Sequence, residues 1–313
     1  SYNTPMGITI TIRNYLKPLH QVFVCEMGAD KVNEIRFLSN MVQPQFGVVT
    51  AIGPQHLNTF KSIDNIINEK MALIEKLPLS GVGVINLDNE YIRNYHIKNQ
   101  CLILSVGIES TDVDFRAVNI EYGPQGSHFD VQTKDNVVVP MQSKLLGEHN
   151  VLNILVSVAL AKQLGISWED IQKAVRGIQQ IEHRLELKTM FGLRFIDNSF
   201  NSNPISAANS LKVLAMMPQQ RILITPGMIE LGDQQTHYNF EFGKAMQGQV
   251  DRVVLIGKGQ SKPIHDGLLA SGFDMEAVHV VNSMKAAFDL VKQKASVHDT
   301  ILIENDLPDA FIY

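Results

Sequence analysis

The hydrophobic pattern of the first part of the chain alternates between continuous apolar runs and helical periodicity. Residues 46–52 form a short β-rich run that ends at a glycine, which predicts a buried strand. Residues 62–77 carry apolar side chains at helical spacing, which predicts a helix with one buried face. The same alternation predicts buried strands at 20–28 and 81–89 and a helix at 31–42. This order favours a mainly parallel sheet covered by helices.

A second series of strands and helices follows a different stretch in the middle of the chain. Residues 102–139 contain short alternating segments that predict an antiparallel hairpin extension, and helices are predicted at 148–165 and 167–178. Later strands are predicted at 193–199, 221–227, 251–257 and 277–282, and helices at 203–217, 237–246, 261–272 and 284–295. We therefore expect two α/β domains, residues 1–183 and 184–313, with the boundary near 180–186.

Composition narrows the class of protein. The 313 residues suffice for two domains, and 45% hydrophobic with 19% charged residues is typical of soluble globular proteins. A net charge of −5 gives no reason to expect nucleic acid or an anionic membrane as a partner. No signal peptide or transmembrane stretch is visible, so we expect a cytoplasmic protein. Cys25 and Cys101 lie too far apart for a metal motif, and Cys25 is expected to be buried. Because Ser1 stands in place of a methionine, we expect a piece of a longer protein.

Three residues of the first predicted domain could carry chemistry. Glu26 directly follows an apolar run, where a buried carboxylate needs a cation or hydrogen bonds; a solvated strand end is the alternative. His56 lies just past the strand at 46–52, where open α/β sheets bind ligands, although taken alone it is more simply a histidine satisfied by its surroundings. Lys70 lies on the helix at 62–77 and, taken alone, is a surface lysine.

The segment after the strand at 193–199 is rich in acid and amide side chains: Asp197, Asn198, Asn201 and Asn203. Pro204 then opens a helix. Asparagines tolerate turn conformations, so a plain loop is one interpretation. Acid and amide groups at a helix N-terminus also suit the ribose or phosphate of a nucleotide, which is the other.

Two further strand-adjacent segments carry polar residues. His149, Asn150 and Asn153 begin the helix at 148–165, with the two asparagines on one face; helix capping is the alternative. Gly227, Glu230 and Gly232 follow the strand at 221–227. Each segment is a weak signal alone. Their joint occurrence at comparable ends of parallel strands predicts a functional site.

The chain resembles the Mur ligases in a series of short motifs, in order from residue 1 to about 260: "NTPMG", "CEMGAD", "TAIGPQHLNTFKSIDNIINEK", "NLDN", "GEHNVLNILVSVALA", "HRLE", "IDNSFNSNP" and "PGMIELG". It is most similar to the branch that adds D-alanyl-D-alanine to a UDP-N-acetylmuramoyl tripeptide. The resemblance implies a central ATPase-type domain with a mainly parallel sheet, followed by a Rossmann-like α/β C-terminal domain. It also implies an ATP-dependent ligase of peptidoglycan precursor synthesis, which forms an acyl phosphate that an amine attacks.

The resemblance implies a role for each candidate of the first domain. Glu26 and His56 match magnesium ligands. Lys70 matches a lysine that carries a carbamate, which turns an ammonium into an anionic oxygen ligand for Mg²⁺ or an orienter of the γ-phosphate. Asn3 and Thr4 match a loop on the substrate side. A bare ammonium at position 70 would instead repel the metal.

The resemblance also assigns nucleotide and substrate contacts. His149, Asn150 and Asn153 match the segment that contacts adenine, and Arg184 matches an arginine at the start of the last domain. Asp197, Asn201 and Asn203 match a motif of the last domain that closes over the nucleotide and helps to position the incoming amine. Within this motif, Asn203 is expected to contact the amine. Glu230 is expected on the substrate side. The implied partners are ATP, Mg²⁺, a UDP-N-acetylmuramoyl peptide and D-Ala-D-Ala or a similar amine, with no nucleic acid, no membrane insertion and a monomeric state.

The sequence departs from the family pattern in three places. The phosphate loop G-x-x-G-K-[ST] is absent, because "GKGQSK" at 257–262 lacks its spacing, so we expect this chain alone to bind ATP poorly and to be inactive. "LIENDLPDAFIY" replaces the usual ending with lysine, glycine and serine, and "DNSF" replaces a form with a second acid and a tyrosine. These changes leave the amine substrate open. A folylpolyglutamate synthase-like ligase and a non-catalytic Mur-like scaffold are the alternatives.

Overall fold

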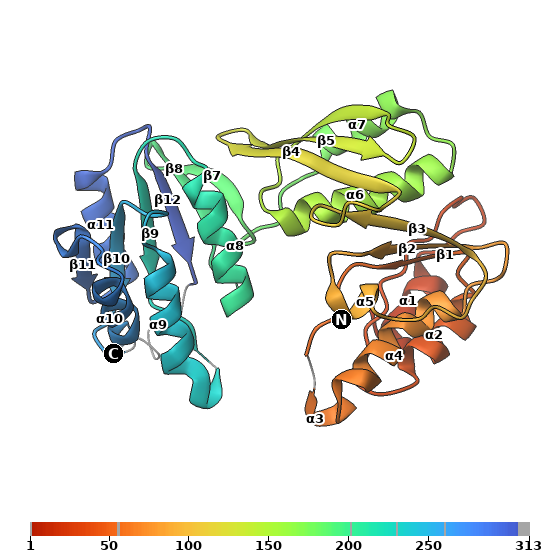
Figure 1. Cartoon of the computed structure of the whole chain (residues 1–313). Helices are drawn as coiled ribbons and strands as arrows, with labels where there is room; N and C mark the ends of the chain where they lie inside the picture. The colour runs from red at the N-terminus through yellow and green to blue at the C-terminus, as the bar shows by residue number, and fades with distance from the viewer. Residues whose placement is uncertain (1, 55–56, 201, 230, 260, 306–313) are drawn as a thin grey trace. The chain divides into compact units, whose positions relative to one another are not determined.

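Two six-stranded sheets organise the chain (Figure 1). The computed structural model describes residues 2–54, 57–200, 202–229, 231–259 and 261–305. Contacts divide the chain into a first unit, Ser1–Val118, Val131–Val139 and Leu152–Trp168, and a second unit, Asn119–Asp130, Pro140–Val151 and Glu169–Tyr313. Both sheets combine mostly parallel strands with helices, which confirms the predicted fold class.

The first sheet has the strand order β1-β2-β3-β4-β5-β6. Its strands are β1 (Phe46–Val49), β2 (Val82–Asn86), β3 (Leu102–Gly107), β4 (Phe115–Gly123), β5 (Gly126–Thr133) and β6 (Val138–Ser143). β1, β2 and β3 are parallel, and all five residues of β2 are buried. β4, β5 and β6 are sheet neighbours joined by the short links 124–125 and 134–137, so they form the predicted hairpin extension. The prediction was wrong for β3, which it included in this extension, because β3 pairs in parallel with both β2 and β4.

The helices that accompany this sheet are α1 (Pro5–Asn14), α2 (Glu34–Val42), α3 (Leu57–Phe60), α4 (Ile63–Glu75), α5 (Glu90–Arg93), α6 (Glu148–Gln163) and α7 (Trp168–Gly177). α4 begins where Ser62 accepts a hydrogen bond from the backbone of Asn65, which is a helix cap. Its residues Ile66, Met71 and Ile74 are buried in the core of the first unit. The helical spacing seen in the sequence therefore marks the face that packs inward.

Residues 20–28 are not a buried strand, contrary to the sequence-based prediction. No strand is assigned there, and Val22 and Val24 are 71% and 88% exposed. Apolar residues form a strand only when a neighbouring strand takes their backbone hydrogen bonds, and neither sheet includes this segment in the described part of the chain. Cys25 is accordingly only half-buried, whereas the sequence analysis expected it to be buried.

The second sheet has the order β11-β10-β9-β12-β8-β7. Its strands are β7 (Glu186–Met190), β8 (Leu193–Asn198), β9 (Arg221–Thr225), β10 (Arg252–Ile256), β11 (Val278–Val281) and β12 (Thr300–Glu304). All neighbours are parallel except the antiparallel edge pair β7–β8. The sequence analysis missed β7 and β12. β12 matters more, because it lies between β8 and β9 in the middle of the sheet.

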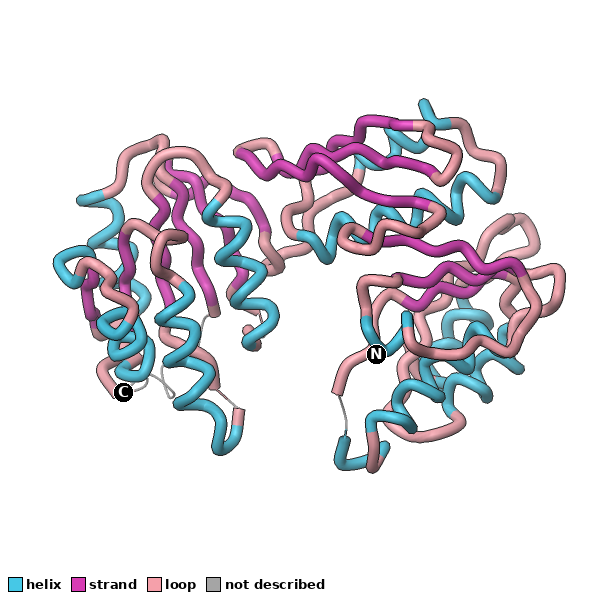
Figure 2. Tube along the Cα trace, in the orientation of Figure 1, coloured by secondary structure: helices cyan, strands magenta, loops and turns pink. Residues whose placement is uncertain are grey.

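Helices cover both faces of the second sheet. They are α8 (Pro204–Ala215), α9 (Gln235–Ala245), α10 (Lys262–Ala270) and α11 (Met284–Lys294), with short 3₁₀ turns at Gly232–Gln234 and Met275–Ala277. α11 packs on one face through Ala287 and Val291, while α8, α9 and α10 lie along the other, as Figure 2 also shows. Among the described helices, none combines the length and apolar character needed to cross a membrane.

Candidate functional site

Asn3 and Glu26, two of the predicted residues, lie in contact in the first unit. The Nδ2 of Asn3 donates a hydrogen bond of 3.1 Å to Oε1 of Glu26, and the N–H of Gly28 donates one of 2.8 Å to the carbonyl of Asn3. A Cβ at position 28 would lie 3.0 Å from Cγ of Asn3, so glycine allows this close approach. Glu26 is exposed, so the desolvation cost that drew attention to it does not arise.

Thr4 is a helix cap and not part of an open loop. Its side chain accepts a 3.2 Å hydrogen bond from the N–H of Gly7, and α1 begins at the next residue, Pro5. The sequence analysis did not predict α1, although "NTP" is a start signal for a helix. The cap fixes the backbone beside Asn3, and so helps to place the group that contacts Glu26.

Lys70 lies on α4, half-buried, and forms no hydrogen bond or ion pair with any residue that the structure describes. The preceding residue, Glu69, is buried and accepts hydrogen bonds of 2.6 Å from the N–H groups of Asn33 and Ile35. These groups belong to the first turn of α2, whose cap residue Asn33 makes no side-chain cap bond. A carboxylate from α4 thus caps α2, a role that sequence spacing could not reveal.

Three predicted residues, His56, Asn201 and Glu230, lie outside the described residues. Neither the contact between Asn3 and Glu26 nor any other described hydrogen bond includes Lys70. The magnesium set expected from the sequence therefore stays a prediction.

The start of α6 carries His149 and Asn150, and Asn153 follows one turn later. Asn150 donates from Nδ2 to the carbonyl of Leu146 at 2.8 Å, so its amide binds backward along the chain and leaves Oδ1 available. His149 and Asn153 are exposed. Partial desolvation and the positive charge of Arg184 lower the pKa of His149, whereas the negative charge of Glu148 raises it. The net pKa is lowered, so the neutral imidazole is favoured.

Arg184 is exposed, and its guanidinium carbon lies 5.3 Å from the ring centroid of Phe200. This is a cation–π geometry, and it orients the arginine without occupying its hydrogen-bond donors. Phe200 belongs to the "DNSF" segment, where the family pattern has a tyrosine. The ring of Phe200 supports Arg184 in this chain.

Asp197, at the end of β8, is the centre of a charged network in the second unit. Its Oδ2 accepts from Nζ of Lys188 and lies 2.9 Å from Nδ1 of His183, while Oδ1 accepts from the N–H of Ser199 at 3.0 Å. Burial raises the pKa of Asp197, but hydrogen bonds from Lys188, Ser199 and His183 outweigh it and hold the pKa below its usual value. Asp197 is thus held as a carboxylate.

Asn203 caps α8. Its Oδ1 accepts from the N–H groups of Ile205 and Ser206 at 3.1 and 3.0 Å, and Pro204 takes the first helical position. Asn203 therefore lies at the N-terminus of a helix, as the sequence predicted. Asn203 is exposed, and its Nδ2 donates to none of the groups that the structure describes.

A buried carboxylate, Glu304, was missed. It ends β12 beside Asn198, whose Nδ2 donates to its Oε2 at 2.9 Å. The two segments that depart from the family pattern, "DNSF" and "LIEND", therefore meet at one hydrogen bond. The available signal was an acid directly after the apolar run 301–303, the same signal that singled out Glu26.

The loop after β9 is held by two amide side chains. The Oδ1 of Asn239 accepts from the N–H of Met228 and its Nδ2 donates to the carbonyl of Met228, both at 2.9 Å. The Nδ2 of Asn305 donates to the carbonyl of Gly227 at 2.7 Å. Gly227 has a φ of 91°, a left-handed conformation that favours glycine. The "TPGM" turn is thus rigidly placed at the end of the sheet.

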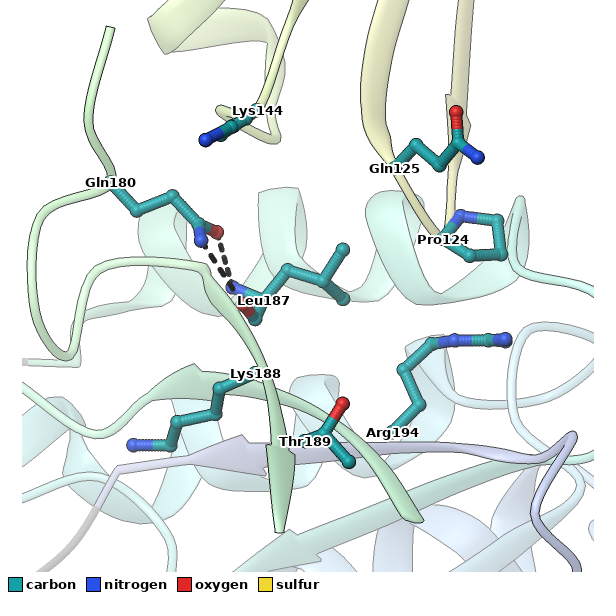
Figure 3. Close-up of a pocket in the computed structure, with 8 residues that line it drawn as sticks. All are labelled: Pro124, Gln125, Lys144, Gln180, Leu187, Lys188, Thr189 and Arg194. Atoms are coloured by element: carbon teal, nitrogen blue, oxygen red, sulfur yellow. Dashed lines mark hydrogen bonds between the residues drawn. The ribbon is translucent and has the colours of Figure 1, made fainter. Parts of the chain in front are cut away.

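A cavity of about 450 Å³ in the second unit has Lys144, Lys188 and Arg194 among its lining residues (Figure 3). These cations do not converge, because Lys188 and Arg194 extend in opposite directions (Figure 3). Lys188 is paired with Asp197, and Arg194 donates to the carbonyl of His298. The cavity contains none of the residues predicted from the sequence.

His183, Glu186 and Asp197 have ligand atoms within 4.8 Å of one another, the one such group among the described residues. The ammonium of Lys188, however, binds both Asp197 and Glu186. A lysine cation already neutralises these carboxylates, and a metal ion would have to displace it. The group is therefore an ion-pair network.

Two α/β units, the second with acid and amide side chains at the end of β8 and the start of α8, define the class of protein. The model of the Mur ligase middle domain matches residues 1–161, and that of the Mur ligase, glutamate ligase domain matches residues 183–304. The first match alone covers more than half of the chain, so the chain belongs to the Mur ligase family.

Relatives of known name match over both domains. The UDP-N-acetylmuramoyl-tripeptide–D-alanyl-D-alanine ligase of Bacillus subtilis is 28% identical over 309 residues, 97% of this chain and 65% of that protein. The corresponding ligase of Escherichia coli is 27% identical over 262 residues, 82% of this chain and 57% of that protein. The chain thus spans about two thirds or less of the length of these relatives.

Solved structures of Mur ligases have a similar fold. Crystal structure II of MurF from Acinetobacter baumannii has a TM-score of 0.79 at 25% identity, over 98% of this chain and 66% of that chain. MurF from Thermotoga maritima in complex with ADP has a TM-score of 0.77 at 19% identity, over 96% of this chain and 67% of that chain, and supports the fold alone.

Proposed function

We propose that the protein is an ATP-dependent ligase of peptidoglycan precursor synthesis. It would join D-Ala-D-Ala, or a related amine, to a UDP-N-acetylmuramoyl peptide through an acyl phosphate. The observation that carries this proposal is the match over 97% of the chain to a ligase of that name. Membership of the Mur ligase family and the polar strand ends support it.

In the first unit, Glu26, His56 and a carbamate on Lys70 would hold Mg²⁺. The available chemistry fits: Glu26 is an exposed carboxylate steadied by Asn3, and Lys70 has no described partner that would compete for its amine. Bound Mg²⁺ would supply charge neutralisation during phosphoryl transfer. Asn3 and Thr4 would lie on the side of the peptide substrate.

In the second unit and α6, His149, Asn150 and Asn153 would contact adenine, and Arg184, Asp197 and Asn201 the rest of the nucleotide. Asn203 and Glu230 would orient the amine. The Nδ2 of Asn203, which has no partner among the described residues, and the exposed Arg184 support these roles. These residues would bind, orient and exclude water, and the amine would attack the acyl phosphate with loss of phosphate.

We also propose a boundary between domains at 183/184, near the start of the second family match, and a monomer in solution. Size-exclusion chromatography with light scattering tests the monomer. Limited proteolysis tests the boundary: if it is right, the first cut should fall in the residues just before 184.

Of the alternatives, the folylpolyglutamate synthase-like ligase is disfavoured by the named relatives, which act on UDP-N-acetylmuramoyl substrates. An activity assay distinguishes the ligase from the other alternative, a non-catalytic scaffold. The complete gene product should release phosphate from ATP only when both a UDP-N-acetylmuramoyl tripeptide and D-Ala-D-Ala are present. Absence of release with every acceptor tested would favour the scaffold.

A lysine pair tests the assigned chemistry. Lys70→Ala should abolish turnover, whereas Lys76→Ala, the same change at an exposed position at the end of the same helix, should leave it within about twofold. Turnover by Lys70→Ala at the level of the unmodified protein, with or without bicarbonate, would refute the carbamate role.

A further inference from the structure

Glu304 is fully buried at the end of β12, in the middle of the second sheet. In the part of the chain that the structure describes, its partners are two hydroxyls and one amide, and no lysine, arginine or histidine is among them. A buried carboxylate without a cation is costly unless hydrogen bonds satisfy it. Its presence therefore calls for an explanation beyond packing.

The three donors come from three different parts of the fold. Ser202 Oγ donates to Oε1 at 2.5 Å, and Ser210 Oγ and Asn198 Nδ2 donate to Oε2 at 2.5 and 2.9 Å. Ser210 lies inside α8, Asn198 ends β8, and Ser202 precedes the cap of α8. Glu304 thus ties a neighbouring strand, a helix and the approach to that helix to one point.

The hydrogen bond between Ser202 and Glu304 helps to fix the start of α8. Ser202 is adjacent to Asn203, the helix cap, and Asn198 also donates to Ser206 Oγ at 3.1 Å in the first turn. The first turn of α8 is therefore fixed from both sides, with Glu304 as the common anchor. A buried polar group that loses its hydrogen-bond partner cannot turn to water instead, which makes such an anchor effective.

We propose that Glu304 is a positioning residue, which anchors Ser202 and so holds Asn203 at the end of the sheet in the orientation that the amine substrate needs. The role in substrate binding rests on the proposed ligase function. The anchoring itself does not, and the two can be tested separately.

Hydrogen–deuterium exchange tests the anchor. Ser202→Ala should raise exchange of the amides of Asn203, Ile205 and Ser206 about tenfold, the effect expected for loss of one hydrogen bond. Ser210→Ala is the control: it removes a hydrogen bond of equal length to the same carboxylate, together with a 2.9 Å hydrogen bond to the carbonyl of Ala207 inside α8. It should raise exchange inside α8 and leave Asn203, Ile205 and Ser206 within about twofold. Equal exchange in Ser202→Ala and the unmodified protein would overturn the anchor.

Kinetics of the complete gene product test the positioning. Ser202→Ala should raise KM for the amine about tenfold and leave KM for ATP within about twofold, whereas a loss of folded protein alone would lower apparent kcat and leave both KM values unchanged. Glu304→Gln should keep KM for the amine within about threefold of the unmodified value, because its carbonyl can still accept two donors and Ser202 can accept from its amide. Glu304→Leu, which has no polar group, should raise KM for the amine as Ser202→Ala does.

The outcomes separate the claims. If the unmodified protein shows no ligase activity, the proposed function fails and exchange still decides the anchor. If exchange rises in Ser202→Ala but KM for the amine stays unchanged, the positioning role is wrong. Glu241→Gln, the same change at an exposed site on α9, should alter neither exchange nor KM.

Discussion

The two units satisfy their buried glutamates in different ways. In the first unit, Glu69 extends from α4 and accepts from two backbone N–H groups at the start of α2. In the second unit, Glu304 ends a strand and accepts only from side chains. Both carboxylates are buried, and neither has a cation among its described partners.

The difference shows what each arrangement can control. Backbone donors are fixed by the helix they belong to, so Glu69 joins two helices and little else. Side-chain donors come from separate elements, so Glu304 joins a strand, a helix and a loop. A carboxylate held by side chains should therefore be the more sensitive of the two to substitution.

The largest effect is expected for Glu304→Ala. It removes the acceptor of three donors, of which Asn198 and Ser210 are buried. We expect a loss of about 3 kcal/mol in the free energy of unfolding, since each unsatisfied buried group costs about 1–3 kcal/mol and the serines can partly reorient. Urea unfolding measures it, with Glu241→Ala as the exposed control. A loss no larger than that of the control would show that the hydrogen bonds of Glu304 do not stabilise the fold.

Glu69→Ala should cost less, about 2 kcal/mol, because it removes a helix cap and not a junction of three elements. Glu69→Gln keeps one carbonyl acceptor and should cost about half as much. Asn68→Ala, exposed on the same helix, is the control. The comparison fails if Glu69→Ala is as destabilising as Glu304→Ala in the same urea titration.

Much of the fold could be predicted from the sequence, because apolar periodicity records which face is buried. β2, α4 and the strands β8 to β11 show it directly. The strand at 20–28 failed because the pattern cannot reveal whether a neighbour exists to pair with it. β12 was missed, although the apolar run 301–303 is the pattern of a short buried strand.

The candidate site was predictable in position but not in detail. The acid and amide side chains of Asp197 and Asn203 lie at the end of β8 and the start of α8, as the order of elements indicated. Their roles were not visible, since Lys188 as the partner of Asp197 depends on a strand, β7, that was not predicted. Glu304 and Asn198 are 106 residues apart in sequence, and no local pattern links them.

Opposite pH dependences should distinguish Asp197 from Glu304. The pKa of Asp197 is below its ordinary value of 3.8, so its contribution to stability is present above that value and is lost as the pH falls through the lower pKa. Burial raises the pKa of Glu304 above 4.5 despite its hydrogen bonds, so its contribution is present below 4.5 and is lost as the pH rises through the higher pKa.

Isosteric amides isolate these contributions, and their effects should be smaller because most hydrogen bonds are kept. Relative to Asp197→Asn, the unmodified protein should lose stability as the pH falls below 3.8. Relative to Glu304→Gln, it should lose stability as the pH rises above 4.5. Urea titrations between about pH 3 and pH 8 measure both differences. Parallel pH profiles for the two variants would contradict the assignment.

The smallest effects are expected for a pair of lysines, one in each unit. Lys188→Met removes the ammonium bound to Asp197 and should cost about 1 kcal/mol, a value kept low because the lysine is partly exposed and His183 still contacts the carboxylate. Lys70→Met should cost less than about 0.5 kcal/mol, because Lys70 has no described partner to lose. A partly buried lysine whose removal leaves stability unchanged but abolishes turnover would be retained for chemistry and not for folding. If Lys70→Met instead destabilises as much as Lys188→Met, its side chain has a structural role, and the case for a carbamate at that position is correspondingly weakened.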